Sequence, residues 1–349
     1  MRVGTRVRSI TLASAALIAG AGLATYAVGA PPAAGPRAGG VLAVYDTVDA
    51  HVATATRLAG NDANLKSVAR ICTPPQQGGG GGAAATSNTA EPAKIFDNLY
   101  FIGIPSVSAW AITTSAGIIV IDSLDNSRES ETFIEGGLKK LRLDPMQVKY
   151  VIITHAHNDH FGGAQYLADK LHAQLVMSET DWGVIERMQP PPAANTNRGP
   201  LPKRGRAVKD GDKLTLGDTT IEIYQTPPHT PGAISLIIPL KDGNQRHVGA
   251  LWGGIGFNFQ QSEANYTTYV NSVEKFAAVA KARGADVPMA NHSNFDNAFQ
   301  KMAALKTRTA GQRHPFVLGA ETQEKIFDIQ QECAMAARAR LRTASASKK

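Results

Sequence analysis

The sequence is poor in several features that mark whole classes of protein. It has only 2 cysteines in 349 residues, and neither belongs to a C-x-x-C pair or another metal-type cysteine spacing. No GxGxxG motif or P-loop follows any apolar run, and no repeat of fixed short period is present. Aromatic residues make up 6% of the chain, whereas 33 Gly and 19 Pro indicate many turns between short apolar segments. Collagen-like, coiled-coil and multi-span membrane classes are therefore excluded.

Acidic residues are also missing from the first thirty positions, which carry Arg2, Arg6 and Arg8 and then an uncharged apolar run over 10–28. A basic segment followed by a short apolar run is the layout of an export signal. We therefore predict a signal peptide over 1–30 and a periplasmic or secreted protein without membrane contact after cleavage. A retained anchor is the alternative, because this run could just span a bilayer. The net charge of +7 depends partly on these arginines and gives no argument for a nucleic-acid partner.

The rest of the chain divides into three parts by composition. We predict an N-terminal helical extension with a Gly-rich linker over 31–93, a main domain over 94–342 and a basic tail over 343–349. In the main domain, apolar runs of strand length come in two groups separated by helical stretches. This pattern favours an α+β fold with sheets covered by helices over a βαβ repeat with one parallel sheet.

The two cysteines lie far apart in the sequence. Cys72 belongs to the extension and Cys333 to a C-terminal helical stretch. In an oxidising compartment, a disulfide between them would tie the extension to the end of the fold. Two separate buried thiols are the alternative, because sequence alone does not show proximity.

A dense cluster of metal-ligand residue types follows the apolar run 148–154. It reads His155-Ala156-His157-Asn158-Asp159-His160 and places four candidate ligands within six residues. Alternate residues of an extended segment point the same way, so His155 and His157 can bind one ion from one side, while Asp159 and His160 face another. Imidazole nitrogen and carboxylate oxygen are ligands that suit zinc.

Two metal ions need more ligands than this cluster contains, and further histidines follow other predicted strands. His229 stands in a rigid turn, Thr-Pro-Pro-His-Thr-Pro-Gly, and His292 follows a strand-like run from residue 286. These two residues are therefore candidates to complete the site.

The cluster, the His229 turn and an upstream strand ending in Asp122 resemble the metallo-β-lactamase superfamily over about residues 95–292. The resemblance implies an αββα sandwich, in which two mixed β-sheets are flanked by helices, and two Zn²⁺ ions per chain. Asp122 would brace the metal loop, the segment around residues 154–162 that carries the histidine cluster, without binding metal. The implied ligands are His155, His157 and His229 for the first zinc, and Asp159, His160 and His292 for the second.

The position of Ile255 separates the subfamilies. Glyoxalase- and lactonase-like members carry a metal-bridging aspartate there, and one β-lactamase subclass carries a cysteine ligand. The six-ligand set resembles subclass B3, which usually has serines around this region, where this chain has Ile255 and Phe257. We expect both residues to contact substrate.

A long polar segment, 189–206, is a second candidate for substrate contact. It contains Asn195, Asn197 and Arg198 and could rim the site, where its cations would attract a substrate carboxylate. A solvated loop is the alternative.

The resemblance implies an exported dizinc hydrolase that opens a β-lactam ring through a zinc-bridging hydroxide oriented by Asp159. A periplasmic lactonase or another ester or amide hydrolase on the same fold is the first alternative. A non-catalytic zinc-binding protein is the second. The expected partner is a small-molecule substrate, and the sequence leaves the oligomeric state undetermined.

Overall fold

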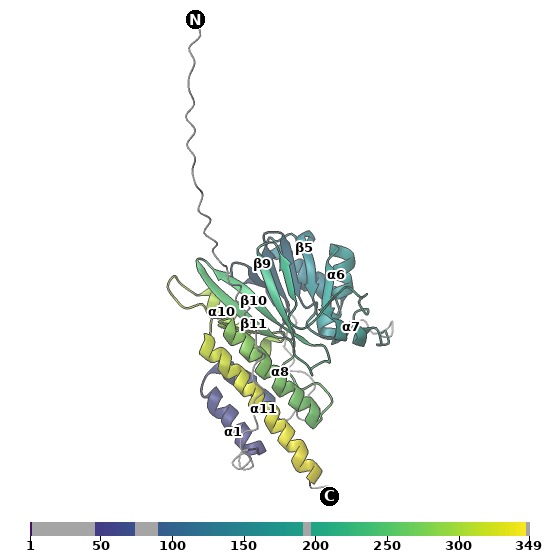
Figure 1. Ribbon diagram of the computed structural model, residues 1–349. Coiled ribbons are helices and arrows are strands. Elements are labelled where there is room, and N and C mark those ends of the chain that lie inside the picture. Colours follow the sequence, from purple (N-terminus) through teal and green to yellow (C-terminus); the bar gives the residue numbers. More distant parts are fainter. Residues whose placement is uncertain (2–45, 74–89, 191–196, 347–349) are drawn as a thin grey trace. The chain divides into compact units, whose positions relative to one another are not determined.

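The computed structural model describes Met1 and residues 46–73, 90–190 and 197–346. The predicted export segment beyond Met1, most of the Gly-rich linker and Asn195 lie outside these residues. The described residues from 46 onward belong to one compact unit, Leu42–Lys349. In this unit two sheets pack face to face with helices outside them (Figure 1), which confirms the predicted αββα sandwich of the α+β class.

The first sheet has seven strands in sequence order. The strands are β1 (Ala93–Lys94), β2 (Leu99–Phe101), β3 (Trp110–Thr114), β4 (Gly117–Ile121), β5 (Val148–Ile152), β6 (Gln174–Ser178) and β7 (Arg206–Val208). Pairing is antiparallel from β1 to β4 and parallel from β4 to β7. The sheet is therefore mixed, as predicted.

The second sheet has five strands in the order β12-β11-β10-β9-β8. These are β8 (Lys213–Leu216), β9 (Thr219–Gln225), β10 (Ile234–Asp242), β11 (Gln245–Trp252) and β12 (Val287–Ala290). Only β11 and β12 pair in parallel, and the other pairs are antiparallel. This sheet is mixed too, and β9, β11 and β12 run in one direction.

The apolar residues of the central strands divide between two cores because successive side chains of a strand point to opposite faces. On β4, Ile119 and Ile121 belong to the core between the sheets, whereas Ile118 and Val120 belong to the core under the helices of the first sheet. A strand buried on both faces has no polar side, which explains the continuous apolar run in the sequence.

Helices cover the outer faces of both sheets. Over the first sheet lie α3 (Ser127–Glu129), a π-helical turn (Ser130–Glu135), α4 (Gly136–Lys140), a 3-10 turn (Pro145–Gln147), α5 (Asn158–Phe161), α6 (Ala164–Leu171) and α7 (Glu179–Ile185). On the side of the second sheet lie α2 (Ala63–Ala69), α8 (Glu263–Ala282) and α11 (Ala320–Ala346), and α1 (Val48–Ala59) packs on α11 and α2. A 3-10 turn (Arg70–Cys72) follows α2, while α9 (Ser293–Asp296) and α10 (Ala298–Lys306) follow β12.

The segment predicted as an N-terminal extension packs on the C-terminal helix. Both α1 and α2 contact α11, and α1 lies beside it in Figure 1. Cys72 and Cys333 form a disulfide with their Cα atoms 4.3 Å apart, which decides between the two alternatives that the sequence left open. Next to it, Arg340 donates a hydrogen bond to the Cys72 carbonyl oxygen over 2.7 Å. The described part of the extension is thus built into the same compact unit as the two sheets.

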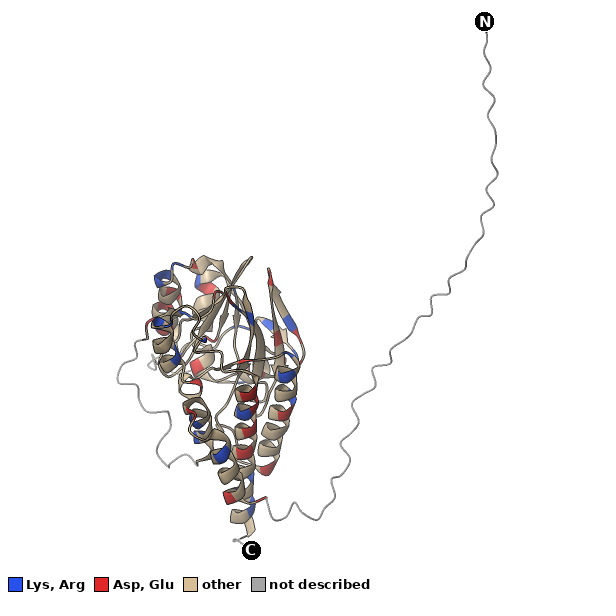
Figure 2. Cartoon of the chain, turned by 90° about the vertical axis from the view of Figure 1, so that its left-hand side faces the viewer, with Lys and Arg blue, Asp and Glu red and all other residues tan. Residues whose placement is uncertain are grey.

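Basic and acidic residues are interspersed along the helices (Figure 2). At the C-terminal end, Arg342 pairs with Asp46 and with Glu263, each at 2.6 Å. Helix α11 ends at Ala346, so the predicted boundary of the basic tail at residue 343 falls inside a helix. Among the described helices, none combines the length and the apolar character needed to cross a bilayer.

Candidate metal centre

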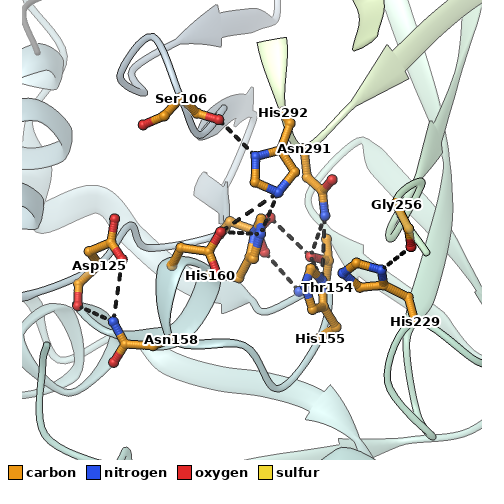
Figure 3. A network of polar contacts seen from close by, with 12 residues as sticks. Ser106, Asp125, Thr154, His155, Asn158, His160, His229, Gly256, Asn291 and His292 are labelled. Atoms are coloured by element: carbon orange, nitrogen blue, oxygen red, sulfur yellow. Dashed lines mark hydrogen bonds and ion pairs between the residues drawn. The ribbon is translucent and has the colours of Figure 1, made fainter. Parts of the chain in front are cut away.

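The candidate ligands follow the carboxyl ends of strands in both sheets. His155 comes shortly after β5, His229 after β9 and His292 after β12. The side chains of these residues and of His160 converge between the two sets of strand ends (Figure 3). The edge beyond the carboxyl ends of strands is a common place for a site in sheets with parallel strands, because loops from several strands meet there.

The structure brings the six predicted ligands together in the two predicted groups. The groups are His155, His157 and His229, and Asp159, His160 and His292. Within each group, one ligand atom from each residue lies within 4.8 Å of the others. In the second group, Nε2 of His160 is 3.2 Å from Nε2 of His292 and 3.3 Å from Oδ2 of Asp159. A single ion could therefore be reached by all three side chains of a group.

His155 provides a test of whether these residues fit a metal ion. The Thr154 hydroxyl donates to Oδ2 of Asp122, so the 3.0 Å contact between Nδ1 of His155 and Thr154 Oγ1 places the ring hydrogen on Nδ1. The other nitrogen, Nε2, is buried and has no hydrogen-bond partner. An unpaired buried nitrogen with a free lone pair, aimed at two further histidines, fits a metal ligand.

His229 and His292 have the same arrangement. Nδ1 of His229 donates to the carbonyl oxygen of Gly256, and Nδ1 of His292 donates to the carbonyl oxygen of Ser106, each over 2.7 Å. Both contacts put the ring hydrogen on Nδ1 and leave Nε2 as the lone-pair nitrogen. Histidines that bind metal usually donate their other N–H in this way.

Asp122 braces the metal loop, as the family resemblance implied. It is buried in a left-handed backbone conformation, with φ of 61°. Its Oδ1 accepts the Thr154 N–H over 2.8 Å, and its Oδ2 accepts the Thr154 hydroxyl and Nδ1 of His160. The carboxylate therefore orients ligands of both groups without reaching the centre itself.

The first group is electrostatically suited to remain neutral. Burial, together with the neighbouring His160, lowers the pKa of His157 to about 4. Burial and the nearby His157 lower the pKa of His229 to about 3. The pKa of His155 also lies well below its ordinary value, chiefly because the ring is buried. All three imidazoles are thus neutral near pH 7, the form that binds metal.

The second group has the opposite balance. Burial alone would lower the pKa of His160, but the carboxylates of Asp159 and Asp122 raise it to about 10. Burial likewise opposes ionisation of Asp159, but His160, His292 and His157 lower its pKa well below the usual range. Asp159 is therefore a carboxylate at neutral pH, and without metal His160 carries a proton that an ion would displace.

Two further residues at the site were missed by the sequence analysis. The Asn291 amide donates to Gly253 O over 2.7 Å and to Thr154 Oγ1 over 3.2 Å, so it joins the loop before His292 to the metal loop. A Cβ atom at Gly254 would lie 2.5 Å from the His229 ring, so only glycine fits there. The only sequence signal for Asn291 is its position beside His292.

The expectation that Ile255 contacts substrate is wrong. Its side chain is 3% exposed and belongs to the apolar cluster under α8 and α11, with Trp252 and Phe327. Its carbonyl oxygen accepts the Tyr269 hydroxyl over 2.9 Å. Gly254 and the Gly256 carbonyl face His229 instead, so the backbone of this loop faces the centre and the Ile255 side chain points into the core.

The other predicted substrate contacts have different surroundings. Phe257 is partly exposed and packs edge-on against Phe259 and Tyr266. Arg198 is exposed and lies between Asn197, whose carbonyl oxygen accepts a hydrogen bond from Asn126, and residue 199.

Gly199 fixes the end of this segment against the metal loop. Its N–H donates to the Asp125 carbonyl oxygen over 2.9 Å, and it packs so closely on Gly162 that a Cβ would collide with the Gly162 carbonyl oxygen. The segment 197–199 therefore lies against the C-terminal end of α5, the short helix that carries His160.

Comparison with known proteins finds a matching family model and relatives that are hydrolases. A model of the metallo-beta-lactamase superfamily matches residues 102–242. A probable metallo-hydrolase of Burkholderia pseudomallei is 28% identical over 97 residues, which cover 26% of this chain and 32% of that protein. A hydroxyacylglutathione hydrolase of Brucella ovis is 26% identical over 130 residues, or 37% of this chain and 43% of that protein. The chain thus matches less than half the length of these curated relatives.

Solved structures match over more of the chain. A subclass B3 metallo-β-lactamase of Bradyrhizobium japonicum has 27% identity and a TM-score of 0.60, covering 74% of this chain and 97% of that one. A metallo-β-lactamase of Legionella gormanii has 24% identity and a TM-score of 0.58, and the match covers 69% of this chain and 93% of that one. The two proteins share the fold. The family model over residues 102–242, the two-sheet fold and these structural matches confirm the predicted resemblance to the metallo-β-lactamase superfamily and its subclass B3.

Proposed function

We propose that this protein is an exported hydrolase that holds two zinc ions and opens a β-lactam ring or a comparable cyclic amide. The observation that carries the proposal is the set of histidine rings whose Nδ1 atoms are held by the protein while their Nε2 atoms converge. His155 is the clearest case, because its buried Nε2 has no other partner. Such a set has a chemical purpose only if the free nitrogens bind metal.

The residues of the site suit hydrolysis without a protein nucleophile. Two zinc ions, when bound, would supply an activated water and polarise the scissile carbonyl group. The neutral rings of His155, His157 and His229 offer lone pairs near pH 7. The Asp159 carboxylate stays ionised and can accept a hydrogen bond from the attacking water, which orients it toward the carbonyl carbon.

Two features support an amide over an ester as the substrate. The subclass B3 structure at 27% identity is covered over 97% of its length. Moreover, Asp159 is the only carboxylate in the two ligand groups of the described residues, whereas glyoxalase- and lactonase-like members carry a second, bridging aspartate. The hydroxyacylglutathione hydrolases among the relatives favour a thioester or ester hydrolase as the second candidate.

A rim for the substrate is proposed at residues 197–199. This segment packs on the metal loop through Gly199, and it presents the exposed Arg198 beside that loop. A cation there would attract the carboxylate that β-lactams carry. Replacing Arg198 with alanine should raise KM for an anionic substrate more than it lowers kcat.

Export is proposed from the basic and apolar N-terminal segment, and the disulfide supports it. Cys72 and Cys333 are bridged, and such bonds persist mainly in oxidising compartments such as the periplasm. Cell fractionation and N-terminal sequencing of the mature protein test this. A protein found reduced, full-length and in the cytoplasm would contradict it.

The central experiment is a substrate panel on the zinc-loaded mature protein, with the zinc content measured on the same sample. The panel holds a cephalosporin, a lactone and a hydroxyacylglutathione thioester. We expect about two zincs per chain and the highest kcat/KM on the cephalosporin. His229→Ala should abolish turnover, whereas His172→Asn, at an exposed histidine outside both groups, should not change it.

The other outcomes separate the alternatives. Preference for the lactone or the thioester would favour the second candidate function. A protein that binds zinc and hydrolyses none of the three would favour the non-catalytic alternative. A well-folded protein without zinc under zinc-replete conditions would contradict the whole proposal.

A further inference from the structure

Asp181 is a fully buried carboxylate outside both ligand groups. It lies in the first turn of α7, which follows β6 and is capped by Ser178, whose Oγ accepts the Asp181 N–H. Its side chain has 0% exposure. The sequence gives it no role, because it belongs to no recognisable motif.

The carboxylate joins the two turns that carry the first ligand group. Oδ2 accepts the Ala156 N–H over 2.8 Å and also the Thr230 hydroxyl. Oδ1 accepts the Gly232 N–H over 2.7 Å. Ala156 stands between His155 and His157 in the sequence, and Thr230 follows His229 directly. Both turns are therefore hydrogen-bonded to one side chain.

These turns come from different sheets, which makes the connection important for the site. The turn with Ala156 follows β5 of the first sheet, and the turn with Thr230 follows β9 of the second (Figure 1). The distance between the ligands depends on how the two sheets meet at this edge. A short, fixed bridge between the turns sets that distance.

Burying the Asp181 carboxylate costs more free energy than burying an apolar side chain in its place would. The donors to Asp181 in these contacts are two backbone amides and a hydroxyl, all neutral, so the hydrogen bonds offset only part of the cost of burying a charge. At Gly232, a Cβ atom would lie 2.2 Å from Ser178 Oγ and 2.7 Å from the Asp181 nitrogen, so close packing also requires glycine there. Stability alone does not explain a buried carboxylate in this place.

We infer that Asp181 is a positioning residue for the first metal group: it fixes His155, His157 and His229 at the separation that one ion needs. The inference rests on the proposed zinc binding. It also gives the two buried carboxylates different roles. Asp122 accepts hydrogen bonds from Thr154 and His160, which serve both groups, whereas the Asp181 carboxylate accepts hydrogen bonds from the two turns of the first group.

The test measures zinc affinity by competition with a chelator, one group at a time. The His292→Ala variant lacks a ligand of the second group, so it serves as the parent in which zinc binding at the first group is measured. The His229→Ala variant lacks a ligand of the first group and serves as the parent for the second. Asp181→Asn presents an amide N–H₂ to donors that need an acceptor. We expect it to weaken zinc binding at the first group about 10- to 100-fold and to leave the second group within about twofold.

Three controls separate positioning from general stability. Asp286→Asn removes a similar carboxylate, which accepts the Val248 N–H and contacts His247 at the opposite end of the strands. It should leave both affinities unchanged. Thr230→Val should weaken the first group to a smaller degree, and Thr230→Ser should restore it. This pair keeps the test valid if Asp181→Asn does not fold.

The results that would overturn the inference are specific. Unchanged first-group affinity in Asp181→Asn and in Thr230→Val would overturn it and leave the proposed function intact. Equal weakening of both groups, matched by Asp286→Asn, would reduce Asp181 to general support of the fold. Absence of zinc binding in the His292→Ala parent would contradict the proposed function itself, and the inference with it.

Discussion

Nδ1 of His160 donates a hydrogen bond to Oδ2 of Asp122 over 2.8 Å, and both side chains are fully buried. The same carboxylate accepts the N–H and the hydroxyl of Thr154. Because the Thr154 hydroxyl in turn contacts Nδ1 of His155, one carboxylate fixes the ring hydrogens of a ligand in each group. This relationship predicts what loss of the charge would do.

Asp122→Asn should weaken zinc binding and lower stability together. An amide offers one acceptor oxygen where three donors now converge, so at least one buried donor loses its partner. We expect zinc affinity to fall about 10- to 100-fold and the free energy of unfolding of the metal-free protein to fall by about 1–3 kcal/mol. Chelator competition and urea unfolding measure the two effects. Asp169→Asn, at an exposed carboxylate, is the control, and wild-type zinc affinity in Asp122→Asn would contradict the prediction.

Ile255→Ser should destabilise the protein without improving turnover. The resemblance to subclass B3, which usually has serines in this region, implies the opposite, because such a hydroxyl would help to hold a substrate carboxylate. Because the side chain lies in the apolar cluster with Trp252 and Phe327, the substitution removes packed methyl groups and buries a hydroxyl. We expect the free energy of unfolding to fall by about 2–5 kcal/mol, against about 0.5–1.5 kcal/mol for Ile255→Val. A stable Ile255→Ser variant with a raised kcat/KM would show that residue 255 faces substrate.

The contrast between His155 and Ile255 shows what the sequence could predict. The ligands of the metal loop follow a strand with a clear apolar run. Because alternate side chains of an extended segment point the same way, the sequence predicts that His155 and His157 face one ion. Ile255 stands in a loop between glycines, where no periodicity tells the direction of a side chain. The structure shows that the backbone bends at Gly253 and Gly256, and the ring of His229 takes the space that a side chain at 254 would need.

Other parts of the fold also depend on contacts that no local pattern shows. Strand β7 is only Arg206–Val208, and β8 begins with an exposed lysine, so their pairing depends on partners far away in the sequence. The bond from Asp181 to Gly232 spans 51 residues, and the bond from Asn291 to Thr154 spans 137. Local pattern identifies ligands and apolar strands, whereas buried polar bridges appear only when the chain is folded.

Loss of the disulfide should weaken the whole fold through its N-terminal helices. Cys72 and Cys333 are 261 residues apart, so the bond closes a very long loop, and it anchors α2 beside α11. Replacing both cysteines with serine should lower the free energy of unfolding by about 2–5 kcal/mol. Urea unfolding with and without reductant measures this. Equal urea concentrations at the unfolding midpoint of the oxidised wild type and of the double variant would contradict this prediction.

The same variant should also show local opening near the second metal group. Ser67 in α2 donates to the Phe295 carbonyl oxygen over 2.7 Å, and Asn297 donates to the Ala63 carbonyl oxygen over 2.9 Å, which joins α2 to the segment after His292. Limited proteolysis should therefore cut first among residues 46–73. Protection of that segment equal to the wild type would argue against the disulfide as its anchor.

The two metal groups should respond differently to acid. In the metal-free protein His157 has a pKa of about 4 and His229 of about 3, both lowered first by burial, so both rings are neutral, with a single N–H, between pH 5 and 7. The His160 ring carries a second proton, because Asp159 and Asp122 outweigh burial and raise its pKa to about 10. Zinc entering the second group must therefore displace a proton, whereas zinc entering the first does not.

Zinc should consequently leave the second group first as the pH falls. Between pH 7 and 5, affinity at the second group should drop about tenfold for each unit of pH, because one proton competes with the ion, while affinity at the first group should change little. Zinc content is measured at a buffered free-zinc concentration over this pH range. The His229→Ala variant gives the slope of zinc affinity against pH for the second group, and His292→Ala gives it for the first. Activity lost in this range should return with added zinc. Equal slopes for the two groups, or earlier loss from the first, would contradict the electrostatic difference between His160 and the buried rings of the first group.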